Sequence, residues 1–406
     1  MKLGIVYHMP FWRAPDGVLY ELEGSFARYV DSLAPYFDEI VLCVPFLREA
    51  GGEGTPVRST NVSIAPLPAF DGPVAFYPRL LSMVPRLLQF VRGIDLLHCR
   101  IPTPAAVFAY AWARLLGRPA FVLVVGDLRA LLPSIGYRGF KMLLWRCYTA
   151  FEELGMQWMV NGSLAFANGA ALAAKHTRPG RAVIETRTTT IETADIASRE
   201  DTCGGPAIRL LTVSRIDPRK GLRILPETLR LLVDRGLDVT IDIVGPAVGA
   251  PGEAERVQID ADASARAVSG RLRFVGPIPL RRLLPLYGNY DVFVLPTLPG
   301  EGIPRVLLEA MTGGLPVVTT RVAGIPGLVT DGVNGLLIDE PAAPALADAV
   351  ARIISDPPLR RRLIAKGYES ARAHTLEAQA AGMMQSVSTR LGITLRRPAV
   401  APAVPA

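Results

Sequence analysis

The chain has 406 residues, of which half are hydrophobic and a fifth are charged, and its formal net charge at pH 7 is +7. This length favours two domains, and the composition is typical of a globular α/β protein, which excludes a disordered or fibrous chain. The sequence has no run of eighteen uncharged apolar residues and starts without a signal peptide, so we expect a cytoplasmic protein that neither spans a membrane nor is exported.

The four cysteines and four histidines are scattered singly along the chain. Zinc and redox motifs need closely spaced pairs of these residues, so the pattern predicts neither kind of site. We expect reduced, mostly buried cysteines, no metal and no cofactor.

Short apolar runs alternate with longer helical stretches through both halves of the chain. The first half has such runs at residues 2–7, 39–46, 95–101, 120–127 and 164–169. The second half has them at residues 208–215, 238–245, 272–277, 290–297, 315–321 and 334–339. This alternation is typical of parallel sheets covered by helices on both faces, so we expect two doubly wound α/β domains.

The stretch between the two halves loses apolar periodicity. Residues 181–205 end in Gly-Gly and are predicted to form a linker. We therefore expect an amino-terminal domain over residues 1–200 and a carboxyl-terminal domain over residues 201–375. Residues 376–406 are expected to form a terminal helix and a Pro/Ala-rich disordered tail.

A basic stretch lies between residues 77 and 150, where the cations face only Asp95 and Asp127. They are interleaved with Leu, Met, Trp, Phe and Tyr, which fits a helix lying on an anionic lipid surface. The alternative is a packed helix that turns its Arg side chains to solvent. Nucleic acid is the less favoured partner, because no recognisable nucleic-acid module accompanies the charge. The cations are Arg79, Arg86, Arg92, Arg100, Arg114, Arg118, Arg129, Arg138, Lys141 and Arg146.

Two segments of the second half combine cations, acids and a helix start. The first, VSRIDPRKG, follows the strand at 208–215 and contains Arg215 and Lys220, which together can neutralise a diphosphate. The second, EGIPRVLLEAMTGGLPVV, starts at Glu301 and follows the strand at 290–297, so it lies where ligands bind in open α/β sheets. Its helix is expected over residues 304–312, with Pro304 at the first helical position and free amide groups that favour a phosphate.

The order of these segments resembles that of family-4 retaining glycosyltransferases, which have the GT-B fold. The resemblance covers residues 207–340 and also includes VGP, FVGPIP and GIPGLVTDGVNGLLID. It implies two Rossmann-like domains that face each other across a cleft, with the donor nucleotide in the second domain and the acceptor in the first. By the same resemblance Arg215 and Lys220 bind the donor diphosphate. Glu301 contacts the donor sugar, and Glu309 binds the ribose.

Gly302, Ile303 and Pro304 complete the expected donor site around the helix start. Arg219 has no firm counterpart in the family and is expected to be a solvated loop residue. A capping acid or a surface cation is the alternative for each position taken alone.

The first half matches the family less well. Gly24 resembles the family's glycine loop at the start of a helix, with Gly17 as the second choice and an ordinary helix cap as the alternative. The chain has Val125 where many members have a histidine that reaches the donor sugar, so Asp127 is a candidate substitute, or else a helix N-cap. Arg100 is a further candidate for the cleft, with an ordinary surface arginine as the alternative.

The resemblance predicts an enzyme that transfers a sugar from a nucleotide diphosphate sugar to an acceptor hydroxyl, in polysaccharide or glycolipid biosynthesis. We expect retention of anomeric configuration, no metal requirement, a glycan or lipid-linked acceptor, and peripheral binding to the inner face of the plasma membrane. The alternatives are a nucleotide-sugar epimerase on the same fold, which would need no acceptor, and a non-catalytic nucleotide-sugar-binding protein.

Overall fold

The computed structural model describes residues 1–22, 24–49, 54–70, 74–128, 139–299, 304–322 and 324–396. The chain forms two compact units, the first made of Met1–Thr188 and Leu376–Ala406 and the second of Thr189–Thr375. The division therefore comes before the boundary expected after residue 200. The terminal helix, expected as a separate segment, belongs to the first unit.

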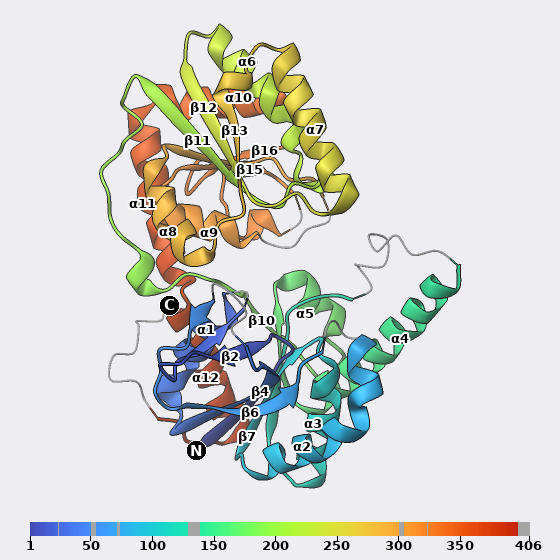
Figure 1. Ribbon diagram of the computed structural model, residues 1–406. Coiled ribbons are helices and arrows are strands. Elements are labelled where there is room, and N and C mark those ends of the chain that lie inside the picture. Colours follow the sequence, from blue (N-terminus) through green and yellow to red (C-terminus); the bar gives the residue numbers. More distant parts are fainter. Residues whose placement is uncertain are drawn as a thin grey trace. The chain divides into compact units, whose positions relative to one another are not determined.

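The first unit is built on a mostly parallel sheet (Figure 1). The strand order is β10-β9-β8-β7-β1-β4-β2-β3-β5, and β6 pairs with β4. Strands β2 and β3 form an antiparallel hairpin at one end of this sheet. The strands are β1 Lys2–Val6, β2 Phe11–Arg13, β3 Leu19–Glu21, β4 Glu39–Leu47, β5 Thr55–Pro56, β6 Val62–Pro68, β7 Leu96–Ile101, β8 Ala120–Val124, β9 Leu164–Asn168 and β10 Ile184–Thr186.

Helices cover both faces of this sheet. One face packs against α1 and α12, and the other against α2, α3, α4 and α5. The helices are α1 Phe26–Leu33, α2 Leu80–Arg92, α3 Pro104–Leu115, α4 Gly139–Gly162, α5 Ala170–His176 and α12 Leu376–Leu391.

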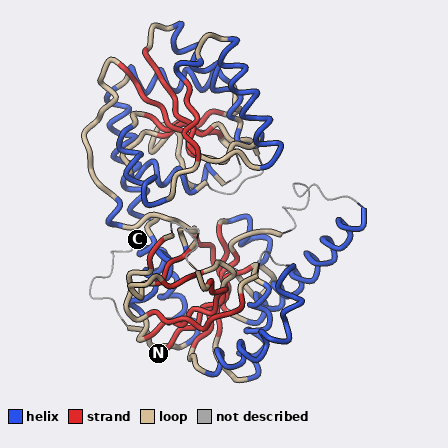
Figure 2. The backbone as a smooth tube through the Cα atoms, in the orientation of Figure 1, coloured by secondary structure: helices blue, strands red, loops and turns tan. Residues whose placement is uncertain are grey.

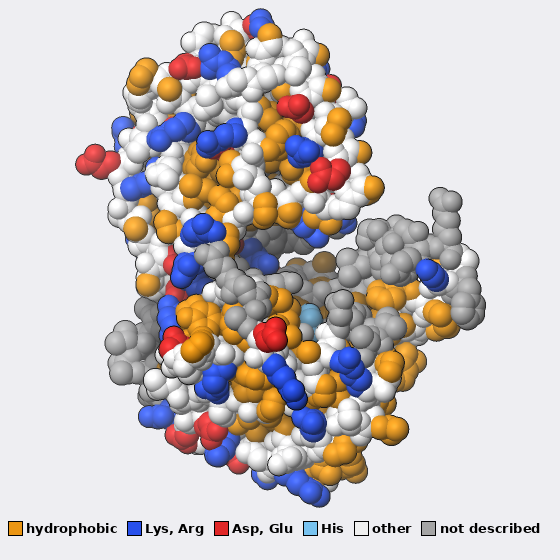
Figure 3. Space-filling view, viewed as in Figure 1, with side chains coloured by type: hydrophobic (Ala, Val, Ile, Leu, Met, Phe, Trp, Pro, Cys, Tyr) orange, Lys and Arg blue, Asp and Glu red, His pale blue; other side chains and the backbone are white. Residues whose placement is uncertain are grey.

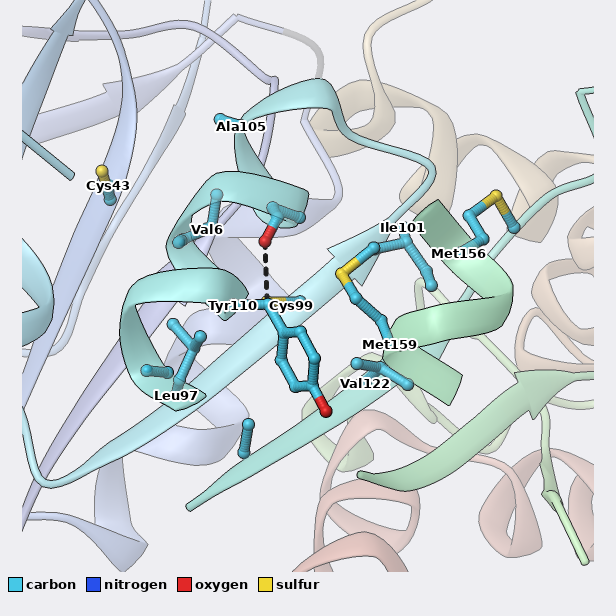
Figure 4. Close-up of a cluster of buried hydrophobic side chains, with 14 of the residues drawn as sticks. Val6, Cys43, Leu97, Cys99, Ile101, Ala105, Tyr110, Val122, Met156 and Met159 are labelled. Carbon is cyan, nitrogen blue, oxygen red and sulfur yellow. Dashed lines mark hydrogen bonds between the residues drawn. The ribbon is translucent and has the colours of Figure 1, made fainter. Parts of the chain in front are cut away.

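Strand β7 shows how the alternation of side chains sorts residues between these two faces. Leu97, Cys99 and Ile101 enter the core beneath α3 and α4, where Tyr110, Met156 and Met159 also lie (Figure 4). The Cys99 thiol donates to the carbonyl of Ala106 at 3.9 Å. Because neighbouring residues of a strand point to opposite faces, the side chains of His98 and Arg100 are directed to the α1 face.

The second unit has an all-parallel sheet with strand order β13-β12-β11-β14-β15-β16. Figure 2 draws its strands in red. Its strands are β11 Ala207–Val213, β12 Asp238–Val244, β13 Leu272–Gly276, β14 Val292–Leu295, β15 Val317–Thr320 and β16 Leu336–Ile338. Its helices are α6 Leu225–Asp234, α7 Gly249–Ala265, α8 Leu280–Leu286, α9 Arg305–Thr312, α10 Ala343–Ser355 and α11 Pro357–Ala373. Both faces are apolar: Leu210 and Val294 enter one core, and Leu211 and Phe293 the other.

The expectation of two doubly wound α/β domains is confirmed, and each of the eleven predicted apolar runs overlaps a strand. Four features were not predicted. They are the β2–β3 hairpin, the short strand β5, strand β6 and strand β10, which lies inside the predicted linker. Strand β6 contains Pro66 and Pro68, which lack the amide hydrogen of a sheet ladder, and it is accommodated because it pairs with β4 alone.

Candidate functional site

The loop after β11 carries both cations predicted to bind a diphosphate. Arg215 is exposed, whereas Lys220 is only 9% exposed at the end of a 3-10 turn, Pro218–Lys220. The carboxylate of Asp217 caps this turn by accepting from the amide of Arg219 at 3.0 Å and from its Nε at 2.9 Å. The hydrogen bonds from the Arg219 side chain lower the pKa of Asp217 to about 2. Arg219 is thus bound to its own loop and stays half exposed, as expected of a loop residue.

The loop after β14 is attached to the same turn. The amide of Leu298 and the hydroxyl of Thr297 both donate to the carbonyl of Arg219, at 2.9 and 3.2 Å. Gly221 has a φ of 65°, and a Cβ atom there would lie 2.0 Å from the carbonyl oxygen of Pro296. Only glycine permits this close contact. The segment with Arg215 and Lys220 is therefore fixed against the segment that leads to Glu301.

The loop after β12 packs against the loop after β11. Gly245 has a φ of 139°, and a Cβ atom there would lie 2.0 Å from the carbonyl oxygen of Ser214. The ends of β11, β12 and β14 consequently form one closely packed edge. Because this is the carboxyl end of a parallel sheet, it is the expected place for a ligand.

Helix α9 supplies Glu309 to this unit. The side chain is 4% exposed, and its two carboxylate oxygens accept from the hydroxyls of Thr190, at 2.5 Å, and Tyr287, at 3.0 Å. Burial and the Glu309 carboxylate raise the pKa of Tyr287 well above its usual value. A carboxylate can accept about four hydrogen bonds, so these two hydroxyls leave Glu309 with acceptor capacity. The sequence analysis predicted neither Thr190 nor Tyr287 as a partner of Glu309. Thr190 lies in the stretch predicted to be a linker.

The start of α9 differs slightly from the prediction. Pro304 is the N-cap residue, with φ −69° and ψ 121°, and the helix begins at Arg305. The extended ψ of Pro304 keeps it out of the first helical turn where we had placed it. No side chain of the described residues caps this end of α9. Glu301, Gly302 and Ile303 lie outside the described residues.

The start of α1 in the first unit is already occupied. Gly24 has a φ of 92° and precedes the N-cap residue Ser25, as expected of a glycine loop. However, the amides of Phe26 and Ala27 both donate to one carboxylate oxygen of Glu21 at 2.8 Å. Glu21 is 1% exposed, so a buried carboxyl group of the chain itself already occupies the first amides of this helix. No sequence motif pointed to Glu21.

Asp127 also has a partner inside the first unit. Its carboxylate pairs with Lys175 of α5 at 3.0 Å, and Lys175 pairs in turn with Glu153 of α4 at 3.1 Å. The helix that Asp127 was expected to cap, at residues 128–132, lies mainly outside the described residues. Gly17, the second choice for the glycine loop, lies in the turn between β2 and β3, where its carbonyl accepts from Arg13 at 2.7 Å.

Arg100 is buried, so the surface alternative is wrong. The residue is 8% exposed, and its guanidinium carbon lies 5.0, 5.4 and 4.9 Å from the ring centroids of Tyr7, Phe26 and Tyr29. Next to this cluster, Nδ1 of His8 lies 3.0 Å from the hydroxyl of Thr103. Burial, and secondarily the charge of Arg100, lower the pKa of His8 to about 4, so the imidazole is neutral at pH 7.

The basic stretch forms much of α2, α3 and α4, and its surface is also apolar. Exposed Leu143, Cys147, Phe151, Leu154 and Trp158 follow one another at spacings of three or four residues along α4, which places them in one stripe. Figure 3 shows hydrophobic side chains interspersed with Lys and Arg in this unit. No helix in the described part of the chain is both long and apolar enough to cross a membrane.

Among the described residues, no group of three or more His, Cys, Asp or Glu side chains is placed to hold a metal ion. Of the four cysteines, which are all free, Cys43, Cys99 and Cys203 are buried and Cys147 is exposed.

Comparison with known proteins finds that part of the second unit is similar to glycosyltransferases. Residues 204–370 match the family model described as glycosyl transferases group 1. The D-inositol 3-phosphate glycosyltransferase of Corynebacterium glutamicum is 32% identical over 173 residues, which cover 42% of this chain and 40% of that protein. A phosphatidyl-myo-inositol mannosyltransferase of Mycobacterium leprae is 29% identical over 181 residues, covering 44% and 46%. The matched part thus spans less than half the length of either relative.

The likeness of the fold extends over both units. The crystal structure of HepE from Anabaena, in complex with UDP, has a TM-score of 0.67 at 17% identity and covers 96% of this chain and 100% of that one. The predicted fold is therefore confirmed as two Rossmann-like α/β domains of the GT-B type.

Proposed function

We propose that this chain is a retaining glycosyltransferase that moves a sugar from a nucleotide diphosphate sugar to an acceptor hydroxyl in polysaccharide or glycolipid biosynthesis. One observation carries the proposal. Within the region matched by the glycosyltransferase family, Arg215 and Lys220 stand on a loop that is hydrogen-bonded to the loop leading into the Glu301 segment. This edge carries two cations, and α9 follows from one of its loops, an arrangement suited to a diphosphate.

The second unit is assigned to the donor. Arg215, Lys220 and the first amides of α9 stabilise the departing diphosphate, Glu301 accepts from hydroxyls of the donor sugar, and Glu309 binds the ribose beside Thr190 and Tyr287. Gly302, Ile303 and Pro304 complete the wall around the phosphates. HepE was crystallised with UDP, so uridine nucleotides are the first donors to test.

In the proposed reaction, the bond from the anomeric carbon to the donor phosphate breaks, and a bond to the acceptor oxygen forms on the same face of the sugar. The leaving phosphate oxygen accepts the proton of the acceptor hydroxyl. The protein then needs no general base, and its main contribution is electrostatic stabilisation of the diphosphate by groups already in position. The two cations perform the task without a divalent metal.

The proposal is tested by incubating the protein with a panel of nucleotide sugars, with and without glycan and lipid extracts. We expect nucleotide diphosphate release that rises with an acceptor. Conversion of the donor without an acceptor would instead indicate an epimerase, and binding without turnover a non-catalytic protein. Glu301→Ala should abolish transfer while it leaves UDP affinity nearly unchanged, and an equal loss of both would contradict the assignment of Glu301 to the sugar.

A finer part of the proposal is that the first unit binds anionic membranes through α2 and α4, from a cytoplasmic location at the inner face of the plasma membrane. The apolar stripe of α4 is exposed beside Lys141 and Arg146, and Arg79 and Arg86 are exposed at α2. Each such cation contributes about 1 kcal/mol of attraction to an anionic surface, and the attraction is screened beyond about 8 Å at physiological salt.

Co-sedimentation with phosphatidylglycerol and phosphatidylcholine vesicles, at low and high salt, tests this surface. We expect binding to phosphatidylglycerol at low salt, and loss of that binding when Arg79, Arg86, Lys141 and Arg146 are all changed to Gln. The matched control changes four arginines of α10 and α11 to Gln, namely Arg352, Arg361, Arg362 and Arg372. Equal recovery of the wild type in all four conditions would leave the stretch as an ordinary solvated face.

A further inference from the structure

Arg100 is a buried cation without a counter-ion among the described residues. It lies at the carboxyl end of β7 on the face covered by α1, two residues after His98. His98 has its own partners, because its Nε2 lies 2.9 Å from the hydroxyl of Tyr29 and its ring stacks on Phe121 at 4.2 Å. In the part of the chain that the structure describes, no carboxylate forms an ion pair with Arg100.

The hydrogen-bonding groups of Arg100 are also unused. Its Nε and Nη1 are fully enclosed and have no hydrogen-bond partner among the described residues. The third nitrogen, Nη2, is not among these enclosed atoms without a partner. Buried polar groups are nearly always hydrogen-bonded, and buried charges are nearly always paired. An unpaired buried guanidinium therefore needs an explanation.

The three aromatic rings around Arg100 explain only part of the burial of its guanidinium. The faces of Tyr7, Phe26 and Tyr29 attract the positive charge, which makes its burial tolerable. Ring faces do not replace the oxygen acceptors that the N–H groups in the guanidinium plane require. The rings thus hold the guanidinium in place and leave its hydrogen bonds for another group.

The surroundings favour an oxyanion as that group. Glu21, the buried acid near this end of α1, already accepts from the amides of Phe26 and Ala27. His8, next to the cluster, is neutral and hydrogen-bonded to Thr103, the N-cap residue of α3. A neutral imidazole and a helix start are both compatible with a bound anion. Arginine is the side chain best suited to a phosphate or carboxylate, because its planar fork matches their oxygens.

We propose that Arg100 binds a phosphate or carboxylate group of the acceptor substrate, so that the acceptor of this enzyme is an anionic molecule. The inference rests on the proposed function in one respect, which is that the first unit receives the acceptor. The donor diphosphate has the same chemistry as a phosphate of the acceptor, so the test must separate these two sources.

The experiment uses the full chain and measures binding of inorganic phosphate, and separately of acetate, by calorimetry in the presence of saturating UDP. The nucleotide fills the donor site of the second unit, so that the remaining binding reports a separate site. Arg100→Gln should weaken this binding at least about tenfold, the scale of a charge-assisted contact, and Arg100→Lys should weaken it less. The control Arg114→Gln removes an equal charge from the exposed side of α3 and should change nothing.

Each outcome separates the two proposals. If the wild type binds neither UDP nor any other nucleoside diphosphate of the donor panel, the proposed function fails whatever the Arg100 variants do. If it binds another of them, that nucleotide replaces UDP in the experiment. If the wild type binds no phosphate or acetate beside UDP, or binds them as tightly after Arg100→Gln, the inference is overturned. If Arg100→Gln weakens UDP binding by the same factor, Arg100 serves the donor, and the assignment to the acceptor is wrong. Circular dichroism and the melting temperature show whether Arg100→Gln folds. If Arg100→Gln does not fold, Arg100→Lys is used for the same comparison.

Discussion

At the carboxyl edge of the second unit's sheet, the loops after β11, β12 and β14 pack backbone against backbone, whereas the same edge of the first unit is lined by aromatic rings and one buried arginine. Both edges have a helix start nearby. At α1 the first amides are satisfied by Glu21, and at α9 no described side chain caps them. The comparison shows that the chain itself can satisfy the first amides of a helix at a sheet edge, as Glu21 does at α1.

The largest effect is expected where the backbone packing of the second unit is disturbed. Gly245→Ala would place a Cβ atom 2.0 Å from the carbonyl oxygen of Ser214, at a φ of 139°. We expect a loss of about 3 kcal/mol in the free energy of unfolding, together with weaker UDP binding.

Denaturant titration measures this loss, and Gly117→Ala in the first unit is the matched control. Gly117 also has a positive φ, 65°, but no atom of the described residues would lie within 4 Å of a Cβ atom added there. We expect that variant to lose only about 1 kcal/mol. Equal losses in the two variants would mean that the close contact at Gly245 is unimportant.

The buried histidines should make the edge of the first unit sensitive to acid. Burial lowers the pKa of His98 to about 3, so this imidazole stays neutral in the folded chain while it takes up a proton below about pH 6.5 in the unfolded chain. The unfolded state then binds more protons, and stability falls as the pH drops from about 6.5 toward 3. By pH 4.5 we expect a loss of about 2–3 kcal/mol from His98 alone.

Urea unfolding at pH 7, 5.5 and 4.5 measures the acid sensitivity, with His98→Phe as the comparison. This variant keeps a ring beside Phe121 but has no group to protonate. Its stability should therefore fall less steeply with acid than that of the wild type. An unchanged slope would assign the acid sensitivity to other groups, such as His8.

The internal anion at α1 can be removed directly. Glu21→Ala leaves the buried amides of Phe26 and Ala27 without an acceptor, which should cost about 2 kcal/mol of stability. Thermal and denaturant unfolding measure the effect, and the exposed Glu49→Ala serves as the control. Similar stability of the two variants would show that the Glu21 carboxylate can be replaced by water.

The smallest change in free energy is expected for the two cations proposed to bind the donor diphosphate. Removing them is also the most direct test of that proposal. Arg215→Ala and Lys220→Ala should each lower turnover at least about tenfold, which corresponds to about 1.4 kcal/mol of transition-state stabilisation. Steady-state rates with the best donor of the panel provide the measurement. A chelator should leave the wild-type rate unchanged, and a strict need for a divalent ion would contradict the metal-free mechanism.

The sequence predicted the second unit better than the first, for a physical reason. In an all-parallel sheet every strand is a short apolar run, and the loops at the carboxyl ends of the strands lie at one edge. Arg215, Lys220 and the start of α9 could therefore be expected at the same edge from the sequence alone. The β2–β3 hairpin and β6 were missed because their strands are short or rich in proline. Their positions depend on pairing with distant segments.

The contacts of the candidate residues were harder to predict than the strands and helices that carry them. Glu21 caps a helix from a preceding strand, and the rings around Arg100 come from a loop and a helix, with no regular spacing along the chain. Thr190 contacts Glu309 across 119 positions of sequence. Such contacts are set by tertiary packing and leave no periodic signal. The resemblance to a family gave Glu309 a role, but it gave no indication of the hydroxyls that hold it.

The placement of α12 has a consequence for how the protein is made. Leu376, Ala380, Met383 and Val387 of this helix complete the core that Leu3, Ile5 and Val30 begin. The second unit is therefore inserted, in terms of chain order, within the first. A ribosome must synthesise all of the second unit before the residues that cover this face of the first sheet emerge. During that interval the nascent first unit has an uncovered apolar face, which is the kind of surface that molecular chaperones bind.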